Sequence, residues 1–255
     1  MLDRRQLQEL TKVSGFNLWQ TEKDYLQHVF LLFLSAESKG EFVFKGGTAL
    51  QKVYGLNRFS LDLDFTSRND NEEEIVKRVV MDIIDFGFAA EVFRVEKFKG
   101  ISKNLALRIK GPLFNGSDRS VAPLRIEVSR RRDMVLGPEV KEVVPIYPDI
   151  RPYLLQVMKP EEILAEKVRA ILYRGRASDL YDLWFLIRKG VKIDLGLVNN
   201  KLSYYKMTFD VKEFRKNVLG MEKMWMEELK PITTFVPAFK KVIEDIEPFF
   251  SNKAD

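Results

Sequence analysis

Cysteine is absent from the 255-residue sequence, and histidine occurs only once. Without cysteine there is no disulfide scaffold, no cysteine-ligated zinc site and no thiol nucleophile. A serine–histidine–aspartate triad or a histidine metal site would have to use His28. That residue stands in an apolar helical stretch between Leu26 and Val29, so we expect a packed or surface histidine instead.

Long hydrophobic runs are also missing. The longest, such as 29–34 and 183–187, are far shorter than the roughly 20 residues of a membrane-spanning helix. The N-terminal residues MLDRRQLQEL are charged and lack the apolar core of a signal peptide. Together with the absence of cysteine, these features lead us to expect a cytoplasmic protein with no membrane partner.

The charge balance leans slightly towards basic residues. Lysine and arginine total 42 against 37 acidic residues, which gives a net charge of +5 and a pI near 9.2. Because a basic surface gathers phosphate backbones by releasing counterions, this excess mildly favours a polyanionic partner such as RNA. Solvated basic side chains without a partner would give the same balance.

The hydrophobic content of 45% is that of a globular protein. Apolar periodicity predicts an α/β (α+β) fold with two helices in residues 1–39, then a helix that ends near Gly87. Strands are predicted at 90–98, 104–110 and 124–129. The proline-rich stretch 133–153 is predicted to be loop. We expect a lobe with a mixed sheet at 1–150 and a mostly helical lobe at 151–255.

Two glycines follow the strand-like run Phe42–Lys45. Gly46 and Gly47 allow unusual backbone angles and close approach to a ligand. Thr48 is predicted to cap a short helix that ends at Gly55. A glycine turn at a helix start presents N–H groups and the positive end of the helix dipole, an arrangement that suits phosphate.

The next segment alternates polar and apolar residues. In a strand, Ser60, Asp62 and Asp64 would share one face, while Leu61, Leu63 and Phe65 would face a core. Two aspartates on one face repel each other unless a divalent cation lies between them, and hard oxygen ligands suit Mg²⁺ beside substrate phosphates. An ordinary hairpin with solvated aspartates is the alternative.

A second polar group falls on two later helices. Lys167 lies beside a small alanine on a partly apolar face of the helix that starts at Pro160, so its ammonium group could reach a ligand. Asp179 and Asp182 are three residues apart on the next helix. A salt-bridge network between Lys167, Arg174 and the two aspartates would use the same residues.

These motifs together resemble the nucleotidyltransferase fold of the DNA polymerase β superfamily, and in particular the AbiEii-type nucleotidyltransferase toxins. The resemblance covers residues 20 to 188. It is carried by the strings KDY at 23–25, GGTAL at 46–50, RFSLDLDF at 58–65 and DLYDL at 179–183, together with Tyr54 and with Glu166, Lys167, Ala170 and Arg174.

The resemblance implies roles for individual residues. Asp62 and Asp64 would bind the metal, and Glu127 would complete the site or accept a proton, unless it only pairs with Arg125 or Arg130. Asp179 or Asp182 would act beside Lys167, with a slight preference for Asp179. The nucleotide would be bound by Lys45, Gly46, Gly47, Thr48, Arg58, Ser60 and Lys167. Of these, Gly46, Gly47 and Thr48 would hold the β- and γ-phosphates, and Lys167 would hold the triphosphate as a point charge. Ser60 would assist triphosphate binding or metal geometry, and Arg58 would fix the Asp-x-Asp strand or a phosphate. Arg130, Arg131 and Arg132 would hold nucleic-acid or nucleotide phosphates, or simply be solvated.

The implied reaction moves a nucleoside monophosphate from an NTP to an acceptor hydroxyl with Mg²⁺ or Mn²⁺. The implied acceptor is the 3′ end of tRNA, the effect is growth arrest, and a separate antitoxin restrains the toxin. Two alternatives stay open at this point: a protein or small-molecule hydroxyl as acceptor, and a non-catalytic fold that binds RNA or a protein partner.

Overall fold

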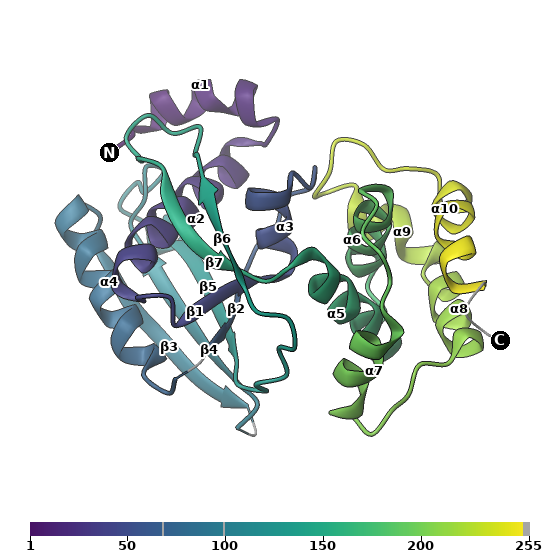
Figure 1. Cartoon of the computed structure of the whole chain (residues 1–255). Coiled ribbons are helices and arrows are strands. Elements are labelled where there is room, and N and C mark those ends of the chain that lie inside the picture. The colour runs from purple at the N-terminus through teal and green to yellow at the C-terminus, as the bar shows by residue number, and fades with distance from the viewer. Residues whose placement is uncertain (68, 99, 252–255) are drawn as a thin grey trace. The chain divides into compact units, whose positions relative to one another are not determined.

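The computed structural model describes residues 1–67, 69–98 and 100–251 and contains two compact units (Figure 1). The first unit consists of Met1–Gly55, Phe59–Arg132 and Pro138–Val157. The second consists of Leu56–Arg58, Asp133–Gly137 and Met158–Asp255. The second unit thus takes two short segments from the part of the sequence that mainly forms the first.

The first unit is built on a mixed seven-stranded sheet in the order β3-β4-β5-β2-β1-β7-β6. Strand β2 runs parallel to β5, and β1 runs parallel to β7, whereas the other neighbours are antiparallel. This confirms the predicted mixed α/β fold. The strands are β1 (Phe42–Lys45), β2 (Leu63–Ser67), β3 (Ala90–Phe98), β4 (Ser102–Ile109), β5 (Ala122–Ser129), β6 (Glu139–Val143) and β7 (Tyr153–Val157).

Local signals explain where the helices of this unit begin and end. The two predicted N-terminal helices are confirmed, and each starts with a capping box, Asp3 with Gln6 and Asn17 with Gln20. The helix predicted to end near Gly87 does so, with that glycine in the left-handed conformation. The helices are α1 (Arg4–Ser14), α2 (Leu18–Glu37), α3 (Gly46–Tyr54) and α4 (Glu72–Phe86).

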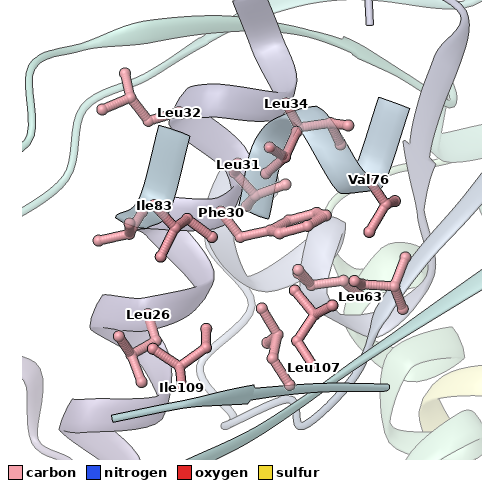
Figure 2. Close-up of a cluster of buried hydrophobic side chains, with 14 of the residues drawn as sticks. Leu26, Phe30, Leu31, Leu32, Leu34, Leu63, Val76, Ile83, Leu107 and Ile109 are labelled. Carbon is pink, nitrogen blue, oxygen red and sulfur yellow. The ribbon is translucent and has the colours of Figure 1, made fainter. Parts of the chain in front are cut away.

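Helices α2 and α4 pack on one face of the sheet and form the main core with it (Figure 2). Phe30 and Leu34 of α2 lie in this cluster beside Val76 of α4 and Leu107 of β4. Because side chains alternate along a strand, burying this face leaves the opposite face of β2, β4 and β5 for polar residues. That opposite face carries Asp64 of β2 and Glu127 of β5.

Two strands lie where the sequence pattern predicts other structure. Strand β6 falls inside the predicted 133–153 loop, and β7 lies mainly in the part predicted to be helical. The prediction was wrong for these residues because prolines flank both segments and each has only five residues. Their pairing, for example Glu139 with Val157, is not local in sequence. Short apolar runs do not distinguish strand from loop without that partner.

The second unit is helical, as predicted. Pro160 at the first position of α5, followed by Glu161 and Glu162, gives that helix a favourable start. None of the described helices of the chain combines the length and apolar character that a bilayer crossing requires. The helices are α5 (Pro160–Tyr173), α6 (Ala177–Arg188), α7 (Leu195–Ser203), α8 (Val211–Gly220), α9 (Glu222–Leu229) and α10 (Phe239–Ser251).

His28 is packed inside the first unit. Its Nδ1 lies 2.8 Å from the Tyr153 hydroxyl, and its Nε2 lies 3.6 Å from Asp24 Oδ2. Burial, together with the nearby Lys52 cation, lowers the pKa of His28 to about 3, because the Asp24 carboxylate only partly offsets these two effects. Lys52 already pairs with Asp24 at 2.7 Å. The expectation of a packed histidine is therefore confirmed, and the ring is neutral at pH 7.

We predict that this histidine stabilises the fold in a pH-dependent way. Its folded pKa is lower than the value near 6.5 in an unfolded chain. Only the unfolded state then takes up a proton as the pH falls, so the contribution is complete above about pH 6.5 and decreases towards pH 3. Because the chain has one histidine, its single ring signal in NMR should not titrate between about pH 8 and pH 5. A titration midpoint near 6.5 in the folded protein would contradict this.

Candidate active site

The glycine turn forms the start of α3, directly after β1. The helix begins at Gly46, and its N-cap is Lys45 with no side-chain capping bond. The prediction that Thr48 caps the helix was therefore wrong. Gly46 has a positive φ of 71°, and a Cβ at this position would overlap the Asp64 carboxylate. Only glycine fits this bend without strain, and the structure brings it against one of the predicted metal ligands.

Strand pairing places three predicted site residues in one row across the sheet. Asp64 of β2 is opposite Lys45 of β1 and opposite Glu127 of β5. Residues in register on neighbouring strands project from the same face. Lys45 is buried, Asp64 is half-buried and Glu127 is exposed, so the row opens towards solvent at its Glu127 end.

Ser60 and Asp62 lie just before β2 and are not part of the strand. The predicted alternation fails here, because β2 begins at Leu63 and Leu61 is 43% exposed instead of facing the core. The buried Thr48 hydroxyl fixes this segment, since it lies 2.7 Å from Ser60 Oγ and also donates to the Asp62 carbonyl. Thr48 therefore joins the first turn of α3 to the segment that carries Ser60 and Asp62.

Two glutamines hold the same segment by its main chain. Gln27 Nε2 donates to the carbonyls of Ser60 and Leu61 at 2.9 Å and 3.0 Å. The Ser60 N–H donates to Gln51 Oε1 at 2.9 Å, and Gln51 Nε2 donates to Asp24 Oδ1 at 2.9 Å. Sequence reasoning did not identify either glutamine as part of the site. A polar Gln27 within the apolar face of α2 was the available signal.

Lys23 adds a buried cation near Asp62. Its ammonium group donates to the Pro123 carbonyl at the start of β5. Burial lowers the pKa of Lys23 to about 8, and Arg125 lowers it as well, whereas the Asp62 carboxylate raises it. On sequence grounds the Lys23-Asp24-Tyr25 element supports the family resemblance and packing, with no catalytic role assigned. The structure adds this electrostatic coupling of Lys23 to Asp62.

The carboxylates of this site fit a magnesium ion that is completed by its substrate. Within the described residues, no three acidic or histidine side chains form a preformed metal cage. Mg²⁺ does not need one, because it keeps several waters and takes one or two carboxylates together with substrate phosphates. The Asp64 carboxylate offers such oxygens beside the glycine bend, and Glu127 lies in register with Asp64. Metal binding by Asp62, Asp64 and Glu127 stays a prediction.

In the second unit, Lys167 binds both candidate aspartates. Its Nζ lies 3.0 Å from Asp179 Oδ1 and 2.6 Å from Asp182 Oδ2. Burial alone would lower the pKa of Lys167, but the two carboxylates outweigh it and raise that pKa. The choice between Asp179 and Asp182 as the acting acid stays a prediction, because both contact the ammonium group.

Two arginines complete this group, here called the buried ion cluster: Arg58, Lys167, Arg174, Asp179 and Asp182. All of its side chains are buried except that of Arg174, which is 49% exposed. The Arg58 guanidinium forms a bidentate salt bridge with Asp182, in which Nε donates to Oδ1 at 2.6 Å and Nη2 donates to Oδ2 at 2.7 Å. Arg174 binds Asp179 through Nε at 2.8 Å and through a terminal nitrogen at 3.0 Å. The salt-bridge network that the sequence allowed is therefore present, and it also includes Arg58.

The arginine run after β5 is partly engaged with acidic residues. Arg130 donates to the buried Glu72 carboxylate at 3.0 Å and 2.6 Å, and Arg132 lies 3.8 Å from Asp70. Arg131 donates to Ser129 Oγ at 3.3 Å. Arg130 thus stabilises the start of α4, and phosphate binding by the run stays a prediction.

Comparison with known proteins gives a consistent picture. The family model described as nucleotidyl transferase AbiEii toxin, type IV TA system, matches residues 32–249. MenT4, a nucleotidyltransferase toxin from Mycobacterium tuberculosis H37Rv, is similar in structure, with a TM-score of 0.71 and 21% identity over 100% of this chain and 91% of that chain. JHP933 from Helicobacter pylori has a TM-score of 0.61 and 20% identity over 93% and 92% of the two chains. No curated protein matches the sequence.

Proposed function

The chain belongs to the AbiEii nucleotidyltransferase toxin family of type IV toxin–antitoxin systems, and from that premise we propose that it transfers a nucleoside monophosphate from an NTP to the 3′ end of tRNA. Family membership implies an NTP substrate and an antitoxin. The observation that supports the catalytic part most directly is the contact between Gly46 and the Asp64 carboxylate. The glycine bend, which suits phosphate, therefore lies next to the Asp64 carboxylate, which suits magnesium.

The proposed chemistry needs positioning and charge neutralisation more than covalent catalysis. Main-chain N–H groups at the start of α3, from Gly46 to Thr48, bind the β- and γ-phosphates. Asp62 and Asp64 would hold Mg²⁺, which would supply neutralisation of the charge on the phosphates. The acceptor oxygen forms a bond to the α-phosphorus, the bond to the leaving pyrophosphate breaks, and Glu127 accepts the proton of the attacking hydroxyl.

Lys167 is proposed to hold the triphosphate as a point charge, as the family resemblance implies. Its two carboxylate contacts keep it ionised at neutral pH. Asp179 and Asp182 then act as positioning residues for the ammonium group. Arg58, by its pair with Asp182, acts through that aspartate and not on a phosphate directly.

We predict that the purified protein labels deacylated tRNA with one or more α-labelled NTPs in the presence of Mg²⁺. Each NTP is offered in turn with tRNA, with total protein, or with small-molecule alcohols such as aminoglycosides. A label that is removed by trimming the 3′ end of the tRNA supports the proposal. Labelling confined to protein or to a small molecule would show that the acceptor is not tRNA. No labelling of any acceptor by any NTP would contradict the proposed nucleotide transfer.

A further inference from the structure

Three tyrosines of the second unit pack against one another at the end of α5 and in the segment after α7, one pair tilted at 38° and the other edge-to-face at 70°. The ring centroids of Tyr173 and Tyr205 are 4.7 Å apart, and those of Tyr204 and Tyr205 are 5.4 Å apart. These three residues are called the tyrosine platform. They join two segments that are about thirty residues apart, so the arrangement comes from tertiary packing and not from helical spacing.

The platform has a fixed centre and exposed ends. Tyr205, the central ring, is half-buried, and the Arg169 guanidinium lies over it at 5.9 Å. Arg169 is itself held by Asp133 at 2.9 Å. The two outer rings remain open to solvent, because Tyr173 is 65% exposed and Tyr204 is 42% exposed. A packed aromatic cluster with accessible outer rings can receive further flat rings on those rings.

Cations lie beside the platform. Tyr173 is part of the wall of a surface hollow of about 460 Å³, whose described lining includes Arg174 and Lys216 and no acidic residue. Lys206 follows the platform directly and is exposed. The acids next to this group are already paired: Asp179 is bound by Arg174 and Lys167, and Asp133 and Glu166 are bound by Arg169. The lining therefore favours an anion.

We propose that the tyrosine platform binds a single-stranded RNA end, with unpaired bases stacked on Tyr173 and Tyr204 and backbone phosphates at Lys206 and Lys216. Stacking on aromatic rings together with contacts to backbone phosphates is how proteins bind single-stranded nucleic acid. A base-paired duplex would use the cations but not the rings, because its bases are already stacked. The inference rests on the proposed function, since it concerns how the acceptor is held.

The test measures RNA binding without NTP, so that it does not depend on nucleotide transfer. A fluorescent single-stranded RNA and a blunt duplex of the same sequence are titrated with the full-length protein, and binding is followed by anisotropy at two salt concentrations. For the Tyr173→Ala/Tyr204→Ala variant we expect at least about thirtyfold weaker binding of the single strand, the loss of two base–aromatic stacks at the low end of their usual range. Binding of the duplex should change little.

Matched variants separate stacking from loss of structure. Tyr173→Phe/Tyr204→Phe keeps both rings and should bind the single strand within about twofold of wild type. Phe235→Ala removes another exposed aromatic ring of the same unit and should have no effect. Lys206→Ala/Lys216→Ala should weaken both RNAs and reduce the salt dependence by about one to two released counterions.

Single-strand binding that the alanine pair leaves unchanged would overturn the proposal. Equal losses for single strand and duplex would also overturn it, because stacking predicts a difference. A platform variant that binds RNA normally but loses interaction with a protein partner would assign the surface to that partner instead. If the tyrosines govern RNA binding while wild-type protein labels no RNA, the proposed function fails and the binding inference stands.

Discussion

Replacing Asp62 with alanine is expected to abolish nucleotide transfer and any toxicity while the chain stays folded. Asp62 is half-buried, lies just before β2 and couples electrostatically to Lys23. Removing a metal-binding carboxylate takes away stabilisation of charge that exists mainly in the transition state. We therefore expect a fall in the transfer rate of at least about 100- to 1,000-fold, the range seen for losing one such electrostatic group.

The side chain of Asp62 can be removed without breaking the hydrogen bonds that fix its segment. Thr48 bonds to the Asp62 carbonyl and not to the carboxylate, so thermal stability should change little. Asp62→Asn keeps the shape of the side chain and should be nearly as inactive, whereas Asp118→Asn, at a side chain 89% exposed, serves as the matched control. Transfer is measured by incorporation of α-labelled NTP. Normal transfer by Asp62→Ala would remove the metal-binding assignment.

The elements that the sequence predicts well are those specified by neighbouring residues. Capping boxes at Asp3 and Asn17 and the left-handed Gly87 mark helix ends locally. The alternation of apolar and polar residues predicts β5 equally clearly, and these residues alternate between buried and exposed in the structure. The contact between Gly46 and Asp64 is also partly specified by nearby sequence, because only a short helix and a turn separate the paired strands β1 and β2.

The parts that could not be predicted depend on partners far away in the sequence. Strands β6 and β7 are defined by pairing with each other and by the parallel pairing of β7 with β1. Arg58 is an arginine directly before the Asp-x-Asp segment, and nothing in its neighbourhood indicates a partner 124 residues away in Asp182. The same holds for Gln27, whose bonds to Ser60 and Leu61 require the tertiary fold.

The pairing of Arg58 with Asp182 has an energetic consequence for the second unit. Asp182 is fully buried, and it neutralises both Arg58 and Lys167, whose side chains are almost completely buried as well. Buried charges are tolerated only when paired, because their desolvation is costly. With Asp182 removed, Asp179 would be the one remaining carboxylate of the buried ion cluster against three cations.

Asp182→Ala should therefore destabilise the second unit by about 3–5 kcal/mol, the usual effect of leaving a buried ion unpaired. The chain has three tryptophans, and Trp184 and Trp225 belong to the second unit. In a Trp19→Phe background, tryptophan fluorescence during urea unfolding reports that unit. Glu247→Ala removes one member of an exposed pair with Arg215 in the same unit and should cost less than about 1 kcal/mol.

A combined variant distinguishes unpaired charge from lost packing. If uncompensated cations cause the loss, Arg58→Met/Asp182→Leu should recover part of the stability that Asp182→Ala loses, since apolar replacements of a buried pair are often well tolerated. Lys167 would still pair with Asp179 in that variant. The contribution of Asp179 to the stability of the second unit depends on pH. Burial alone would raise the pKa of Asp179, but Lys167 and Arg174 hold it below its usual value. This stabilisation is therefore present above about pH 3.9 and is lost as the pH falls below that. If Asp182→Ala destabilised the second unit no more than Glu247→Ala does, the buried ion cluster would not be stabilising that unit.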